Sequence, residues 1–223
     1  MRIALTMRVT GAADYHEPLD AISHDWIDWL AAHGHVPVLV PNRLSNADGY
    51  LAAMQADALI LTGGNDVVAT PDRPDATAAV RDATETALLV EARRNGIPVL
   101  GICRGLHMVN RYFGGTIEPD LSAGRISHVA VTHEVMLTPG FSDLANNSLV
   151  STNSYHTQGV TSAGLASGLH AFATCADDEL IEGLHHVSEP ILAVQWHPER
   201  PTPCPEFDDV LIDRLFRNGA FWR

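Results

Sequence analysis

The feature that most constrains the fold is a regular alternation of apolar runs and amphipathic stretches in the N-terminal half of the chain. Apolar runs at residues 1–8, 35–41, 57–62 and 98–102 are typical of strands. Helices are predicted between them at three places: around Leu19, Ile22, Trp26, Trp29 and Leu30 up to Gly34, over 46–55, and over 76–95. Strands joined by helical crossovers lie parallel, with right-handed connections. We therefore expect an α/β fold of three layers, with a mostly parallel central sheet and helices on both faces.

The pattern changes after Gly115. Short strand-like runs follow one another with little room for crossover helices, at residues 116–117, 128–137, 149–150, 170–175, 180–185 and 191–196. They predict a small antiparallel addition to the sheet. Residues 207–217 carry apolar positions at helical spacing and predict a closing helix.

Length and composition narrow the class of protein. A chain of 223 residues with 46% hydrophobic residues can bury one large core, so we expect a single domain over residues 1–223. The net charge of −13 disfavours a nucleic-acid interface. No apolar stretch is long enough for a membrane span, and residues 1–6 lack the features of a signal peptide. The three cysteines fit a reducing compartment, so we expect a cytoplasmic protein without membrane association.

One cysteine stands in an unusual setting. Cys103 follows the apolar run 98–102 and lies between Gly101 and Gly105, where a helix is predicted to begin near Arg104. A sharp turn from strand to helix that exposes a reactive side chain is a nucleophile elbow. The partial positive charge at the helix N-terminus favours a thiolate there. A small buried structural cysteine is the alternative for such a residue taken alone.

Two further strand ends carry residues that suit a thiol nucleophile. His197 and Glu199 follow the last strand two positions apart, so a carboxylate can orient an imidazole that acts as base. At the end of the third strand, Gly63 and Gly64 expose backbone N–H groups. With the N–H of Arg104, one of these could form an oxyanion hole.

These motifs resemble the class I glutamine amidotransferase superfamily, and within it the stand-alone γ-glutamyl hydrolase branch. The resemblance rests on Leu61-Thr62-Gly63-Gly64, Gly101-Ile102-Cys103-Arg104-Gly105 and Gln195-Trp196-His197-Pro198-Glu199, and covers nearly the whole chain. It implies a flavodoxin-like sheet, Cys103 as nucleophile, His197 as general base and acid, and Glu199 as its orienting partner. It also implies that Gly64 and Arg104 donate to the oxyanion.

The resemblance extends to candidate substrate-binding residues. The segment Asn153-Ser154-Tyr155-His156-Thr157-Gln158 resembles the family segment beside the γ-glutamyl group, where Ser154 and Tyr155 are the preferred candidates. The family usually has Gln four residues after the nucleophile, and this chain has His107. The imidazole either contacts the substrate in place of the amide or packs on the helix.

The N-terminal stretch Thr6-Met7-Arg8, Tyr15-His16-Glu17, Leu19-Asp20 and Trp26 is similar to γ-glutamyl-CDP-amidate hydrolases of capsule phosphoramidate biosynthesis. This likeness implies that Arg8 and His16 meet a phosphate and that Tyr15 stacks on a base. A surface role for Arg8 and a loop anchor at Tyr15 are the alternatives.

The sequence favours a cysteine-dependent hydrolase that releases glutamate from a small-molecule γ-glutamyl amide through a thioester. A γ-glutamyl-γ-aminobutyrate or polyamine hydrolase, a glutaminase subunit that passes ammonia to a synthetase, and a non-enzymatic binding module are the alternatives. No cofactor is expected. No metal site is predicted, because His33, His35, His128, His185 and His186 have no recognisable ligand spacing. The oligomeric state stays open, with a homodimer as one alternative.

Overall fold

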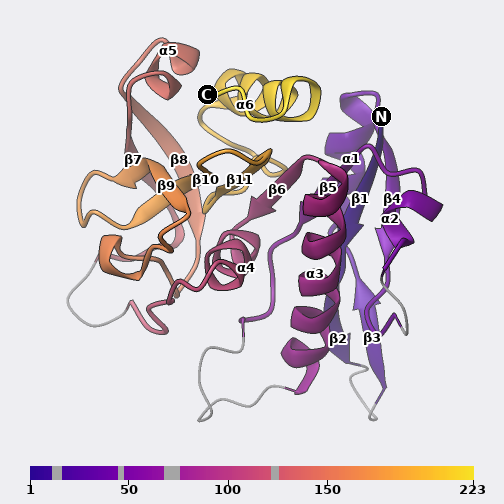
Figure 1. Cartoon of the computed structure of the whole chain (residues 1–223). Coiled ribbons are helices and arrows are strands. Elements are labelled where there is room, and N and C mark those ends of the chain that lie inside the picture. Colours follow the sequence, from indigo (N-terminus) through magenta and orange to yellow (C-terminus); the bar gives the residue numbers. More distant parts are fainter. Residues whose placement is uncertain (12–16, 45–47, 68–75, 122–125) are drawn as a thin grey trace.

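A nine-stranded sheet forms the centre of the molecule (Figure 1). The computed structural model describes residues 1–11, 17–44, 48–67, 76–121 and 126–223. The strand order is β4-β1-β5-β6-β11-β10-β9-β7-β8. These strands are β1 (Arg2–Thr6), β4 (Val36–Val40), β5 (Ala58–Leu61), β6 (Val99–Ile102), β7 (Val129–Leu137), β8 (Leu149–Tyr155), β9 (Leu169–Cys175), β10 (Ile181–His186) and β11 (Ile191–Val194). Strands β4, β1, β5, β6 and β11 pair in parallel, and β10, β9, β7 and β8 extend the sheet with antiparallel pairings.

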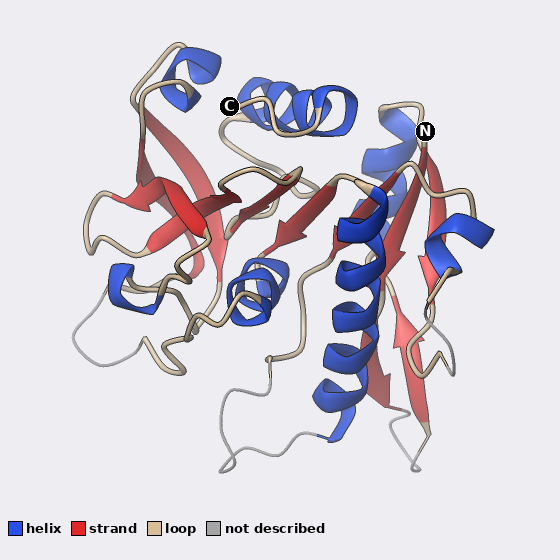
Figure 2. Ribbon diagram, viewed as in Figure 1, coloured by secondary structure: helices blue, strands red, loops and turns tan. Residues whose placement is uncertain are grey.

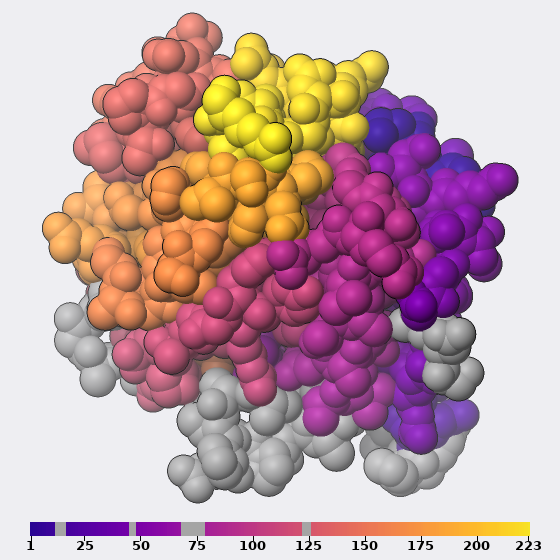
Figure 3. Space-filling view, viewed as in Figure 1, coloured from indigo at the N-terminus to yellow at the C-terminus, as the bar shows by residue number. Residues whose placement is uncertain are grey.

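Helices cover both faces of this sheet, as Figure 2 shows. On one face lie α1 (His24–Ala32), α5 (Phe141–Ala145) and α6 (Pro205–Asn218); on the other lie α2 (Tyr50–Ala53), α3 (Ala76–Asn95) and α4 (Arg104–Tyr112). Each face buries its own apolar cluster, one around Trp196 and Phe172 and the other around Leu61 and Leu88. In the space-filling view the C-terminal residues, in yellow, lie between the indigo N-terminal residues and the orange residues of β9 and β10 (Figure 3). The predicted three-layer α/β class is confirmed.

The N-terminal region departs from the prediction. Leu19 belongs to a strand, β3 (Pro18–Ala21), which pairs antiparallel with β2 (Arg8–Gly11) in a separate two-stranded sheet. Helix α1 starts later, after Ser23, whose hydroxyl accepts a hydrogen bond from the N–H of Asp25. Leu19 is therefore part of a hairpin, and the apolar face of α1 begins with Trp26.

Two further predictions differ from the structure: one helix is shorter than predicted, and one predicted strand does not form. Helix α2 is shorter than the predicted 46–55, because Gly49 has a left-handed backbone (φ 80°) directly before it, and residues 45–47 lie outside the described residues. The run 116–117 forms no strand; nearby, Glu118 makes one isolated bridge to Gly159. A short 3₁₀ helix, η1 (Ser162–Gly164), completes the elements. No helix in the described ranges has the length and apolar character to span a bilayer.

The sheet order sets the position of the site. Strands β5, β6 and β11 are neighbours and run parallel, with Leu61 beside Gly101 and Ile102 beside Val194. Their carboxyl ends therefore open at one edge of the sheet, where ligands bind in this class of fold. The loops that follow these three strands carry Gly64, Cys103 and His197, as the sequence predicted.

Candidate active site

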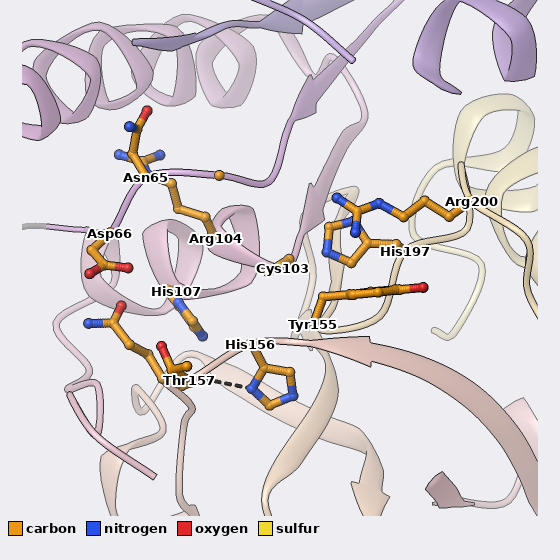
Figure 4. Close-up of a pocket in the computed structure, with 12 residues that line it drawn as sticks. Asn65, Asp66, Cys103, Arg104, His107, Tyr155, His156, Thr157, His197 and Arg200 are labelled. Atoms are coloured by element: carbon orange, nitrogen blue, oxygen red, sulfur yellow. Dashed lines mark hydrogen bonds between the residues drawn. The ribbon is translucent and has the colours of Figure 1, made fainter. Parts of the chain in front are cut away.

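The turn between β6 and α4 has the geometry of a nucleophile elbow. Cys103 has φ 53° and ψ −102°, a left-handed backbone that a non-glycine residue adopts only when its surroundings impose it. A Cβ at Gly101 would lie 2.7 Å from the carbonyl oxygen of Gly105, and one at Gly105 would lie 2.2 Å from that of Leu61. Both glycines are therefore required for the turn to close against β5, and the turn directs Cys103 into the pocket (Figure 4).

His197 meets the sulfur from the neighbouring strand end. Its Nδ1 lies 2.7 Å from Oε1 of Glu199, so the carboxylate fixes the ring. Burial alone would lower the pKa of His197, but its hydrogen bonds with Cys103 and Glu199, with the charges of these two groups, outweigh burial and raise the pKa to about 9. His197 is thus an imidazolium at neutral pH. A cation beside the sulfur is the setting in which cysteine nucleophiles react as thiolates.

Arg81 of α3 fixes the glycine loop after β5. Its guanidinium donates to the carbonyl oxygens of Thr62 at 2.6 Å, Gly63 at 3.1 Å and Gly64 at 2.5 Å. Because a trans peptide points its N–H away from its carbonyl, the Gly63 bond turns the N–H of Gly64 away from Arg81. Gly64 lines the pocket that contains Cys103.

The predicted oxyanion donors therefore lie beside the nucleophile. In the described part of the chain, no group accepts a hydrogen bond from the backbone N–H of Gly64 or Arg104. The Arg104 side chain points elsewhere, into buried ion pairs with Asp82 and Glu85. The Arg104 side chain thus ties α4 to α3 and leaves its backbone N–H at the start of the helix.

The sulfur and imidazole open into a cavity of about 430 Å³. Its lining comes from the loops after β5, β8 and β11, from the end of β8, and from Cys103 with the first turn of α4: Gly64, Asn65, Asp66, Cys103, Arg104, His107, Tyr155, His156, Thr157, Gln158, His197 and Arg200. Tyr155 is 42% exposed, and its ring centre lies 5.6 Å from that of His197. The guanidinium carbon of Arg200 lies 4.5 Å from the Tyr155 ring centre. A cationic group and an aromatic ring therefore flank the reacting groups, as Figure 4 shows.

His107 reaches the cavity as a neutral side chain. Burial is the main cause that lowers its pKa, to about 3, and its Nε2 lies 2.9 Å from Oε1 of Gln195. It is a buried residue of α4 that contacts Gln195 and lines the pocket. Ser154, by contrast, is not among the lining residues: it is fully buried, and its hydroxyl donates to the carbonyl oxygen of His128 at 2.8 Å.

Of the three candidates from the N-terminal stretch, the structure describes Arg8 alone. Arg8 lines a smaller cavity of about 40 Å³ together with Gly64, His197 and Arg200. Arg8 therefore lies close to His197 and beside the glycine loop after β5. Tyr15 and His16 lie outside the described residues.

Sequence reasoning missed several residues that position the site. The side chain of Asn153 accepts from the backbone N–H of His197 at 2.8 Å and donates to its carbonyl at 2.9 Å. Arg81 looked like an ordinary helix-surface charge, and its spacing of four from Glu85 was the available signal. His156 belongs to the quoted motif, but its place in both the pocket and a buried group with His128 and Glu182 becomes visible only in three dimensions.

Comparisons with known proteins identify the family of the chain. Residues 3–199 match the model of the Peptidase C26 family. The chain is 34% identical to "Putative glutamine amidotransferase-like protein YvdE" of Lactococcus lactis, over 87% of each chain. It is 29% identical to "Gamma-glutamyl-CDP-amidate hydrolase" of Campylobacter jejuni, over 90% of each chain.

The fold is shared with solved structures. A glutamine amidotransferase from Thermotoga maritima superposes with a TM-score of 0.63 at 13% identity, over 98% of this chain and 85% of its own. Taken with the matched residues 3–199, the chain belongs to the Peptidase C26 family, which is class I glutamine amidotransferase-like.

Proposed function

We propose that the protein hydrolyses a γ-glutamyl amide through a γ-glutamyl thioester on Cys103. The observation that carries the proposal is the contact of Cys103 with an imidazole that Glu199 orients and whose pKa is raised to about 9. Family membership supports hydrolase chemistry of this kind. An ion pair of thiolate and imidazolium supplies both the nucleophile and the acid that an amide needs.

The first half of the reaction forms the thioester. The Cys103 thiolate attacks the γ-carbonyl carbon, and the N–H groups of Gly64 and Arg104 bind the developing oxyanion. Each such donor contributes roughly 3 kcal/mol to lowering the barrier. The intermediate collapses as the C–N bond breaks, and His197 gives its proton to the leaving nitrogen.

The second half regenerates the enzyme. Neutral His197 takes a proton from water, and the resulting hydroxide adds to the thioester carbonyl. The C–S bond then breaks, glutamate leaves, and the thiolate and imidazolium are restored. Glu199 stabilises the imidazolium in both halves without itself accepting the proton.

We further propose that the leaving amine carries phosphate, as in a nucleotide amidate. The likeness to the Campylobacter jejuni protein supports this substrate class. Arg200 and Arg8 add two cationic side chains beside the reacting groups, in a chain whose net charge is −13. Guanidinium groups bind phosphate oxygens through paired, charge-assisted hydrogen bonds.

Glutamate release from a panel of γ-glutamyl amides tests both the thioester mechanism and the phosphate-bearing leaving group. The panel should contain a nucleotide amidate, γ-glutamyl-γ-aminobutyrate, a γ-glutamyl polyamine and free glutamine. Cys103→Ala is expected to lose at least about 10³-fold in turnover. The half-buried Cys204, outside the pocket lining, provides the matched control Cys204→Ala, which should keep full activity.

Each outcome decides between the candidate functions. Full hydrolysis by Cys103→Ala would overturn the thioester mechanism. Preference for the polyamine or γ-aminobutyrate compound would overturn the phosphate-bearing leaving group alone. Hydrolysis of free glutamine that appears only when a second protein is added would favour the glutaminase alternative.

A further inference from the structure

A buried group of histidines lies behind the wall of the pocket, outside the proposed chemistry. His128 precedes β7, His133 lies on β7, His156 follows β8, and Glu182 lies on β10. All four residues are at most 6% exposed. One potential ligand atom each from His128, His156 and Glu182 lies within 4.8 Å of the other two.

Hydrogen bonds fix which nitrogens of two rings carry hydrogen. Nδ1 of His156 lies 2.7 Å from the carbonyl oxygen of Gln158, which can only accept, so Nδ1 is protonated (dashed in Figure 4). Nε2 of His128 lies 3.0 Å from a carboxylate oxygen of Asp178, so Nε2 is the donor there. In the neutral rings, Nε2 of His156 and Nδ1 of His128 then carry bare lone pairs. Second partners that hold metal-binding histidines in this way are a regular feature of metal sites.

The inward-facing atoms of this group are unsatisfied. Within the described ranges, neither oxygen of Glu182 has a hydrogen-bond partner, and neither has Nε2 of His156 nor Nδ1 of His128. Glu182 is fully buried, and its two oxygens face the rings of His156 and His133. A buried carboxylate that faces lone pairs requires a cation between them.

The distances indicate which kind of cation fits. Nε2 of His156 lies 3.5 Å from Oε1 of Glu182, and Nε2 of His133 lies 3.4 Å from Oε2. A shared proton would draw each pair to about 2.8 Å. Ligands around a tetrahedral zinc ion, at about 2.0–2.1 Å from the metal, are separated by about 3.3 Å. The separation of His156 Nε2 from Glu182 Oε1 is close to that of two zinc ligands.

We propose that His128, His156 and Glu182 bind a divalent metal ion of the Zn²⁺ class, with His133 beside the second carboxylate oxygen. Imidazole nitrogen and carboxylate oxygen are ligands that zinc accepts, and two histidines with one glutamate are a known zinc set. Cys175 is the alternative donor near His128 and His133.

The proposed metal site adjoins a second cavity and the catalytic pocket. A cavity of about 300 Å³ is lined by His128 and His156, which gives an ion a route to the ligands. His156 and Thr157 line both this cavity and the catalytic pocket. Metal binding would therefore hold the segment after β8 that forms one wall of the pocket.

The test measures metal directly, in protein without an affinity tag. Cys103→Ala serves as the parent, because the catalytic thiol and His197 could themselves bind zinc. After chelator treatment and dialysis with Zn²⁺, elemental analysis should find about one ion per chain. With Co²⁺ the parent should show the absorption of a low-coordinate nitrogen and oxygen site.

Added substitutions identify the ligands. His156→Gln, His128→Gln and Glu182→Gln should each weaken Zn²⁺ binding at least about 100-fold, since even indirect partners cost 10- to 100-fold. The exposed His24 gives the matched control His24→Gln, which should bind as the parent does. Zinc should also raise the Tm of the parent and of the control, but not of Glu182→Gln.

Two results would overturn the proposal. The first is a parent protein that retains no metal, a measurement that needs no ligand variant to fold. The second is zinc binding that persists undiminished in the His128 and His156 variants. The group would then be a network of protonated imidazoles around Glu182. Neither result bears on hydrolysis at Cys103, so the two proposals fail independently.

Discussion

At the scale of single residues, Glu199 controls the charge of the His197 imidazole. Its hydrogen bond and its charge both raise the pKa of His197. Glu199→Gln removes the charge and keeps the shape. We therefore expect the pKa of His197 to fall from about 9 and the alkaline limb of the kcat/KM profile to move to lower pH, because the imidazolium is lost earlier as pH rises. The rate at the optimum should fall about 10²- to 10⁴-fold.

The readout is the pH profile of glutamate release. Glu206, an exposed residue on α6, gives the matched control Glu206→Gln, whose profile should equal that of the parent. An unchanged alkaline limb in Glu199→Gln would show that Glu199 does not set the charge of His197.

Gly63 is the second residue on which the site depends. A Cβ there would lie 2.9 Å from Cε1 of His197 and 3.6 Å from Cβ of Cys103, so a methyl group must push the imidazole aside. Gly63→Ala should lower kcat roughly 10- to 100-fold, since displacement by about 1 Å disrupts the reacting geometry. Gly168→Ala, where the nearest atom is 3.6 Å away, is the control for the loss of a glycine. Measuring kcat and Tm together separates a displaced imidazole from a destabilised fold. The prediction fails if Gly63→Ala keeps the kcat of the parent, or if kcat falls only in proportion to the unfolded fraction.

At the scale of elements, helix α3 supports the oxyanion loop through one side chain. Arg81 is fully buried and holds three successive carbonyls, and Glu85 one turn later binds both Arg81 and Arg104. Arg81→Lys keeps the charge but cannot serve three carbonyls with one ammonium group. We expect kcat to fall roughly 10- to 100-fold with little change in KM, because the Gly64 donor acts mainly in the transition state.

The comparison for Arg81→Lys is Arg94→Lys on the exposed side of the same helix, where the partner is Asp48. A parallel rise of KM and fall of kcat in Arg81→Lys would indicate a displaced pocket, and unchanged kinetics would mean that the loop keeps its shape without Arg81.

The elements that the sequence predicted well are those with local causes. Helix α3 has the predicted bounds, and the turn at Cys103 follows from Gly101 and Gly105, whose missing side chains the close approach requires. The hairpin of β2 and β3 was missed because its strands are stabilised by each other, and neither carries a distinctive pattern. Arg81 and Asn153 were missed for the same reason: their roles depend on partners far away in sequence.

At the scale of the whole molecule, the site exists only because distant segments meet at one sheet edge. The sequence predicted parallel strands before residues 63 and 103 but assigned the run before His197 to the antiparallel addition. The structure instead pairs β11 in parallel with β6, and the order β5-β6-β11 places the three strand ends side by side. The pattern of strands alone does not bring the end of β8, from the antiparallel half of the sheet, to the pocket; only the family resemblance implied that Tyr155 lies there. That placement depends on the packing of the complete sheet.

Because His107 is buried in its neutral form, we expect the free energy of unfolding of the protein to depend on pH. Its pKa is about 3 when folded, mainly through burial, and about 6.5 in an unfolded chain. Above pH 6.5 the residue is neutral in both states and contributes no pH dependence. As pH falls below 6.5, only the unfolded chain binds the proton, so folding loses about 1.4 kcal/mol per pH unit.

His107→Gln removes this proton site while an amide can still bond to Gln195. Between pH 7 and pH 5 the parent should therefore lose about 2 kcal/mol more unfolding free energy than the variant. Urea unfolding at the two pH values measures this, and taking the difference within each protein cancels any stability change that the substitution itself causes. His24→Gln, at an exposed histidine, should behave as the parent. If parent and His107→Gln lose the same free energy, His107 takes up a proton in the folded protein, and the imidazole that faces the pocket is charged rather than neutral.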